Sequence, residues 1–102
     1  MRLIWRSLVS YRVNWNMPEV SRFYGIQTLS YYRDLRPTHF HAIYAEHEAL
    51  VEIEMGNIYE GNLSKKTLEL VNEWRVLHHD ELREDWERAR KEKPPLPIAP
   101  LQ

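Results

Sequence analysis

The chain has 102 residues, 43% of them apolar, and a formal net charge of −1, as expected for one small globular domain. It contains no cysteine, which excludes disulfides, thiolate catalysis and cysteine-ligated zinc or iron–sulfur centres. No apolar run approaches the roughly 20 residues of a membrane-spanning helix, and the nearly neutral charge argues against a strongly basic nucleic-acid-binding protein. These features predict a cytoplasmic protein without a cofactor and without membrane contacts.

Residues 1–16 differ in composition from the rest of the chain. They hold three arginines and no acidic residue, and Arg12 and Asn14 interrupt any hydrophobic core of a signal peptide. A more regular pattern begins at Met17. We therefore expect residues 1–16 to be a poorly ordered or spurious extension, without which the charge would be (14 − 3) − 15 = −4. An additional N-terminal strand is the alternative.

The next part of the chain has the composition of an antiparallel meander of about four to five strands. Gly25 indicates a bend or bulge, residues 34–37 are rich in turn formers, and Gly56-Asn57 is a hairpin signal. The segments with strand composition are residues 20–24, 26–32, 39–44, 49–55 and 58–61.

After residue 63 the apolar spacing becomes helical. Ser64 is a good N-cap, and Asp80 could cap a second helix, so either two helices or one long or kinked helix over residues 64–92 is expected. Pro94-Pro95 ends the helical pattern, which leaves residues 93–102 as a Pro-rich extended tail, either loose or packed back. The sequence thus predicts a single α+β domain over residues 17–92, with the helices on one face of the sheet.

Two histidines lie two residues apart in the segment with strand composition at residues 39–44. Because side chains alternate along a strand, His39 and His41 should share one face, with Phe40, Ala42 and Tyr44 on the other. A hairpin centred between residues 46 and 47 would pack that second set against apolar residues of the next strand. The clean separation of polar and apolar faces favours this register.

The same register predicts a polar constellation on the histidine face. His41 would lie opposite Glu52, and His39 opposite Glu54, with Tyr59 across from Glu54. A carboxylate that orients an imidazole is suited to general acid–base catalysis, so His39, His41, Glu52 and Glu54 are candidate catalytic residues. The same four side chains could hold a divalent metal. A cross-strand charge pair on a solvated sheet is the simpler interpretation.

A basic and aromatic cluster is the second candidate site. Such mixtures bind phosphate groups and stack on bases, although an ordinary sheet surface can have the same composition. The candidate residues for nucleic-acid or phosphate binding are Arg22, Arg33, Arg36, Tyr31 and Tyr32.

From Met17 onward the chain resembles a small prokaryotic family, the domain of unknown function 4160. The matching stretches are residues 17–26, Tyr31-Tyr32, His39-Phe40-His41 with Tyr44, residues 48–53 and 60–63, Trp74, His78, Glu81-Leu82 and Trp86. The resemblance implies a bacterial protein encoded in a two-gene cassette of the toxin–antitoxin kind. It assigns no catalytic residues.

Three functional hypotheses follow. The first is a non-enzymatic interaction module of a toxin–antitoxin-like pair, which binds a cognate small protein encoded nearby, with RNA or operator DNA as a further ligand. The second is a small metal-independent ribonuclease that uses His39 and His41 as acid and base, with Arg33 or Arg36 on the phosphate. The third is a metal-binding protein that uses the His and Glu face. Homo-oligomerisation is compatible with all three.

Overall fold

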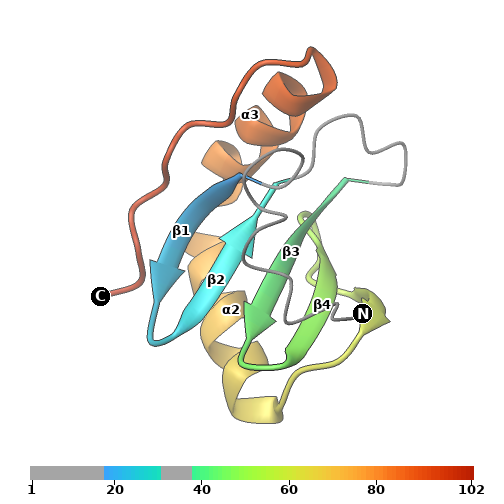
Figure 1. The fold of residues 1–102 in the computed structure, drawn as a ribbon, viewed down its shortest axis with the longest axis vertical. Helices are drawn as coiled ribbons and strands as arrows, with labels where there is room; N and C mark the ends of the chain where they lie inside the picture. Colours follow the sequence, from blue (N-terminus) through green and yellow to red (C-terminus); the bar gives the residue numbers. More distant parts are fainter. Residues whose placement is uncertain (1–17, 31–37) are drawn as a thin grey trace.

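The computed structural model describes residues 18–30 and 38–102, and it consists of an antiparallel sheet and two helices (Figure 1). The strand order is β1-β2-β3-β4-β5, the simple meander. This confirms the predicted α+β class. The elements are β1 (Glu19–Phe23), β2 (Ile26–Leu29), β3 (His39–Tyr44), β4 (His47–Glu52), β5 (Ile58–Gly61), α2 (Lys65–Leu77) and α3 (His79–Arg90).

The sheet and α2 enclose the main core. Trp74 of α2 is fully buried and contacts the rings of Phe23 and Phe40, at centroid distances of 5.3 and 5.6 Å. Alternation places Ala42 on the same face of β3 as Phe40, as predicted. In Figure 1, α2 lies behind the sheet and α3 lies at the end where β3 begins.

The helical region is divided in two at His78. The backbone of His78 leaves helical geometry, and α3 begins at His79. The alternative of one continuous helix is therefore wrong, and so is Asp80 as the cap, because Asp80 lies in the first turn of α3. The imidazole Nδ1 of His78 contacts the Glu81 carboxylate across this junction. The prediction for Ser64 is confirmed, since its hydroxyl accepts a hydrogen bond from the Thr67 N–H at 3.2 Å.

The predicted pairing of β3 with β4 is wrong by two residues. Tyr44 lies opposite His47, so the hairpin has a two-residue loop centred between residues 45 and 46. The loop is tight because Ala45 adopts a positive φ of 54°. Alanine rarely takes this conformation, so an alanine in the sequence gives no signal for such a loop. A shift of two residues keeps every side chain on its face, and the two faces are therefore as predicted.

The C-terminal tail packs back on the domain. The N–H of Ile98 donates to the carbonyl of Val20 on β1 at 2.8 Å, and Trp74 Nε1 donates to the carbonyl of Ala99 at 2.8 Å. Ile98 and Leu101 are buried. Neither of the two described helices has the length and apolar character for a bilayer crossing. The expectation for residues 1–16 falls outside the described part of the chain.

Candidate functional site

The predicted histidine face is present, but its pairs differ from those expected. Leu50 lies opposite His41, and Glu52 lies opposite His39. His41 instead meets Glu48: its Nδ1 lies 2.8 Å from Glu48 Oε2. The imidazole is 3% exposed and the Glu48 side chain 28%. The predicted pairing of His41 with Glu52 is therefore wrong, and the carboxylate that His41 meets is that of Glu48.

His39 lies among aromatic rings. Its ring centroid is 5.1 Å from that of His41, 5.3 Å from Trp86 of α3, and 6.2 Å from Tyr59 in an edge arrangement. Partial desolvation raises the pKa of the Tyr59 hydroxyl, as do the negative charge of Glu52 and a hydrogen bond to it. Both histidine residues are 2% exposed. A solute cannot reach imidazoles this deeply buried. The acid–base role of His39 and His41 stays a prediction.

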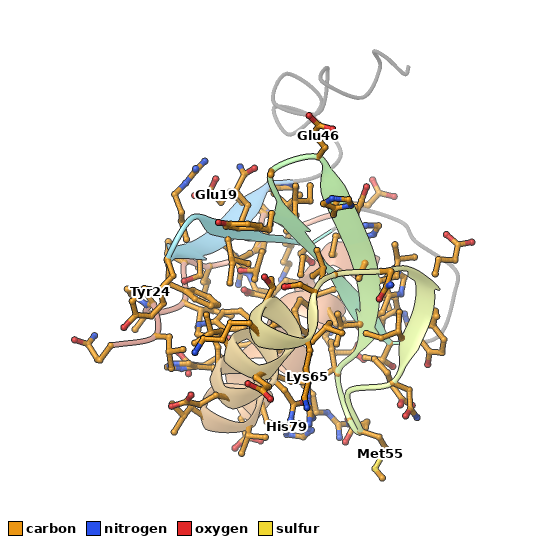
Figure 2. All side chains as sticks on the ribbon, turned by 90° about the horizontal axis from the view of Figure 1, so that it is seen from below. Glu19, Tyr24, Glu46, Met55, Lys65 and His79 are labelled. Atoms are coloured by element: carbon orange, nitrogen blue, oxygen red, sulfur yellow. The ribbon has the colours of Figure 1, made fainter. Side chains whose placement is uncertain are left out.

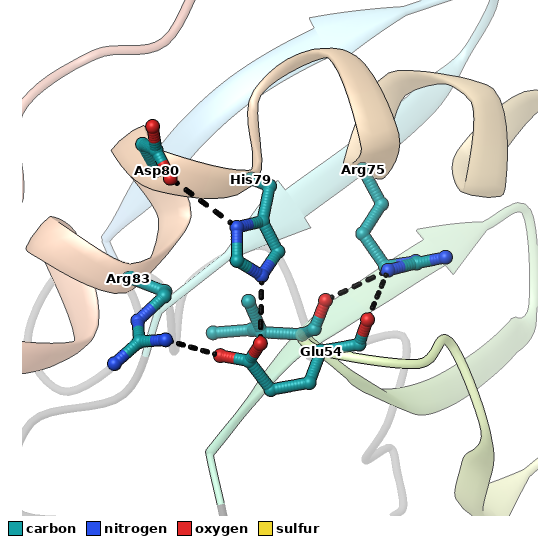
Figure 3. A network of polar contacts seen from close by, with 6 residues as sticks. Glu54, Arg75, His79, Asp80 and Arg83 are labelled. Carbon is teal, nitrogen blue, oxygen red and sulfur yellow. Dashed lines mark hydrogen bonds and ion pairs between the residues drawn. The ribbon is translucent and has the colours of Figure 1, made fainter.

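Glu54 lies in the turn between β4 and β5 and joins a separate network with α3 (Figure 3). Its two carboxylate oxygens lie 2.9 Å from His79 Nε2 and 2.9 Å from Arg83 Nη1, both from α3. His79 Nδ1 also lies 3.3 Å from Asp80. Nearby, Arg75 Nη1 donates to the carbonyls of Ile53 and Glu54 at 2.8 and 2.9 Å. These contacts tie the turn to both helices.

The network corrects the predicted partner of Glu54. Glu54 lies opposite no histidine of β3, because β4 ends at Glu52 and the chain turns before Glu54. Nothing in the sequence indicated that His79 is the partner of Glu54, because the two residues come together only when α3 packs beside the turn. Both nitrogens of His79 and both oxygens of Glu54 are occupied, which suits a structural link better than proton transfer.

The metal hypothesis finds no assembled site in the described residues, and most of the candidates for phosphate binding lie outside them. Residues 18–30 and 38–102 contain no group of three or more His, Asp or Glu side chains placed to hold a metal ion. The Arg22 guanidinium pairs with Glu19 at 2.9 Å, and Gln27 donates to the same carboxylate at 2.8 Å. The other four candidates, Tyr31, Tyr32, Arg33 and Arg36, lie outside the described residues.

A groove of about 590 Å³ lies between the β4–β5 turn, β5 and the first half of α2. All four residues of β5 are exposed. Met55 at the turn is 71% exposed and Ile58 of β5 is 37% exposed, and both line the groove. The sequence did not single out this surface. The full lining is Val51, Met55, Gly56, Ile58, Asn62, Leu63, Lys65, Leu68, Glu69, Val71 and Asn72.

Asp85 of α3 is a buried acid that was not predicted from the sequence. It is 2% exposed, and its Oδ1 accepts a hydrogen bond from the N–H of Leu96 at 2.7 Å. Its Oδ2 is buried with no hydrogen-bond partner among the described residues. Burial raises the pKa of Asp85 to about 6. A signal existed: Asp85 lies three residues after Leu82 and four before Ala89, on the apolar stripe of α3.

The chain belongs to the family described as Domain of unknown function (DUF4160), whose pattern it matches over residues 25–87. That range covers more than half of the sequence and runs from the β1–β2 turn to the last part of α3. We find no match among curated proteins and none among solved structures.

Proposed function

We propose that this protein is a non-enzymatic interaction module, a cytoplasmic member of a toxin–antitoxin-like two-gene system in bacteria. Its partner would be a small cognate protein encoded nearby, with nucleic acid as an additional ligand. The groove beside β5, with its exposed apolar rim, is the observation that carries this proposal. Exposed apolar surface next to a concave, mostly apolar lining is characteristic of protein-binding sites.

The composition of the groove supports a protein partner. Its floor contains Val51, Leu63 and Val71, while Lys65 and Glu69 lie on its lining as charged groups. An apolar centre with polar groups around it is the usual anatomy of a specific interface. Met55 is the most exposed of the large apolar side chains that line it and would gain the most from being covered.

The burial of His39 and His41 favours this function over a ribonuclease. An acid–base pair must come within hydrogen-bond reach of its substrate. Both histidines are 2% exposed, and His39 packs against Trp86. Side chains in that position pack within the fold, and the proposed function requires no other role of them.

Co-expression tests the proposal directly. The tagged chain is produced together with the untagged product of the adjacent gene and purified through the tag. The proposal predicts that the two proteins elute together from a sizing column at a fixed ratio. A tagged chain that elutes alone, folded and without its neighbour, would contradict the proposal.

A further inference from the structure

The C-terminal tail makes contacts of a kind that peptide-binding proteins make with their ligands. Residues 94–102 follow α3 and run beside β1 (Figure 1). Four backbone groups of the tail are bound: the carbonyl of Pro94 accepts from Arg88 Nε, Asp85 accepts from Leu96 N–H, Val20 accepts from Ile98 N–H, and Trp74 donates to the carbonyl of Ala99. Their partners come from three different elements, α3, β1 and α2. The domain thus binds the tail backbone at four places between residues 94 and 99.

The side chains of the tail divide into buried and exposed ones. Ile98 is 4% exposed and Leu101 is 8% exposed, whereas Leu96 is 45% exposed. Pro97 and Pro100 are exposed. Backbone hydrogen bonds combined with pockets for spaced side chains are the basis of strand-addition recognition, in which an extended segment docks on a sheet edge.

The edge of β1 is prepared for such a segment. Val20 lies at an irregularity of the β1–β2 pairing, and its carbonyl accepts from Ile98 instead. The prolines of the tail carry no N–H, and the tail N–H groups that the domain binds are those of Leu96 and Ile98, which alternate with prolines in the sequence. Prolines also hold the segment near the extended form, which lowers the entropy that is lost on docking.

We propose that the β1 edge, with Trp74 and Asp85, is a recognition site for an extended, proline-containing apolar segment, occupied in cis by residues 94–102 and open to the same segment of a second copy of this chain. A surface complementary to its own tail is equally complementary to the tail of any other copy. The tail in cis has the advantage of a high effective concentration, so exchange between copies is expected only at high protein concentration.

A peptide with the sequence of residues 94–102 tests the site on the full-length chain. The chain used in this test carries Ile98→Asp, which weakens the binding of its own tail and changes no residue of β1, α2 or α3. Isothermal titration calorimetry should show saturable binding of one peptide per chain, with a rise in the melting temperature. A control peptide with serine at the positions of Ile98 and Leu101 keeps all the prolines and should bind at least about tenfold more weakly.

Each outcome decides the proposal. A folded Ile98→Asp chain that binds neither peptide, or binds both equally, would overturn it. If circular dichroism shows that the variant is unfolded, the native peptide should restore its native spectrum and the control peptide should not. An unfolded variant that stays unfolded at millimolar native peptide would also overturn the proposal.

The second copy as occupant has its own measurement. The wild-type chain is refolded at high protein concentration and analysed by size exclusion with light scattering. We expect a dimer fraction that returns to monomer after dilution and incubation, and we expect none from Ile98→Asp. Exclusive monomer from the wild type, or equal dimer from both chains, would contradict exchange of the tail.

Discussion

The carboxylate of Asp85 on α3 accepts a hydrogen bond from the backbone N–H of Leu96 at 2.7 Å. This bond joins α3 to the tail that runs beside β1. The carboxylate is nearly fully buried, and its second oxygen has no partner among the described residues. Burial first, and the neighbouring Glu84 and Glu81 to a smaller extent, raise the pKa of Asp85 to about 6 despite the lowering effects of the Leu96 N–H and Arg88. This carboxyl group therefore takes up a proton at a higher pH than an ordinary aspartate does.

The pH dependence of stability follows from this pKa. The folded chain binds the Asp85 proton more tightly than the unfolded chain, where the usual value is 3.8. The contribution to stability is therefore complete below about pH 4 and is lost as the pH rises through about 6. The difference between a pKa of about 6 and the usual 3.8 corresponds to at most about 3 kcal/mol of stability.

Asp85→Asn should therefore stabilise the protein at neutral pH. Asparagine keeps the oxygen that accepts from Leu96 and cannot ionise. We expect the free energy of unfolding to rise by about 1–3 kcal/mol at pH 8 relative to wild type. Urea denaturation at pH 4 and pH 8 measures this difference, which should nearly vanish at pH 4. An equal difference at both pH values would show that ionisation of Asp85 is not its source.

Gly61→Ala should destabilise the β4–β5 pairing that forms one wall of the groove. Gly61 has a φ of +77°, and a Cβ there would lie 2.0 Å from the backbone oxygen of Glu48. A backbone clash cannot be relieved by a side-chain rotation, so we expect a loss of more than about 3 kcal/mol.

Gly25→Ala is the matched control for Gly61→Ala. Gly25 also has a positive φ, but a Cβ there meets only the ring of Tyr44 at 3.1 Å. The cost should be about 1–2 kcal/mol, from the backbone conformation alone. Chemical denaturation of both variants provides the comparison, and equal losses would disprove the steric account of Gly61.

The two components of the Figure 3 network should differ in their effect on stability. The Glu54 side chain is 41% exposed, so its ion pairs with His79 and Arg83 are screened by water, and Glu54→Ala should cost less than about 1 kcal/mol. Arg75 is 7% exposed and binds two backbone carbonyls, so Arg75→Ala should cost about 2–4 kcal/mol. Denaturation curves rank the two variants. The opposite order would mean that the exposed network, and not Arg75, holds the turn.

The parts of the fold that depend on local pattern could be predicted from the sequence. Ser64 caps a helix in almost any context, and the alternation around Phe40 and His41 defines the two faces of β3 without knowledge of the partner strand. The pairing register could not be predicted, because it depends on a tight loop at Ala45, and alanine is uncommon at positive φ.

The contacts between distant segments could not be predicted from the sequence, for a different reason. Glu54 meets His79, and Asp85 meets Leu96, only after the helices have packed, and no spacing rule relates these positions. The polar residue on the apolar stripe of α3 was visible in the sequence, but its partner was not. The groove residues are ordinary strand and helix residues, and their surface exists only in the folded chain.

The groove beside β5 is the proposed binding site of the cognate protein, and calorimetric titration of that protein with matched variants of the chain tests this assignment. Figure 2 shows Met55 and Tyr24 on different sides of the molecule. They are 71% and 60% exposed, so aspartate at either position should leave the fold intact. We predict that Met55→Asp weakens binding of the cognate protein at least about tenfold and that Tyr24→Asp binds like wild type. Equal affinity of wild type and Met55→Asp would contradict the assignment of the groove as the partner site.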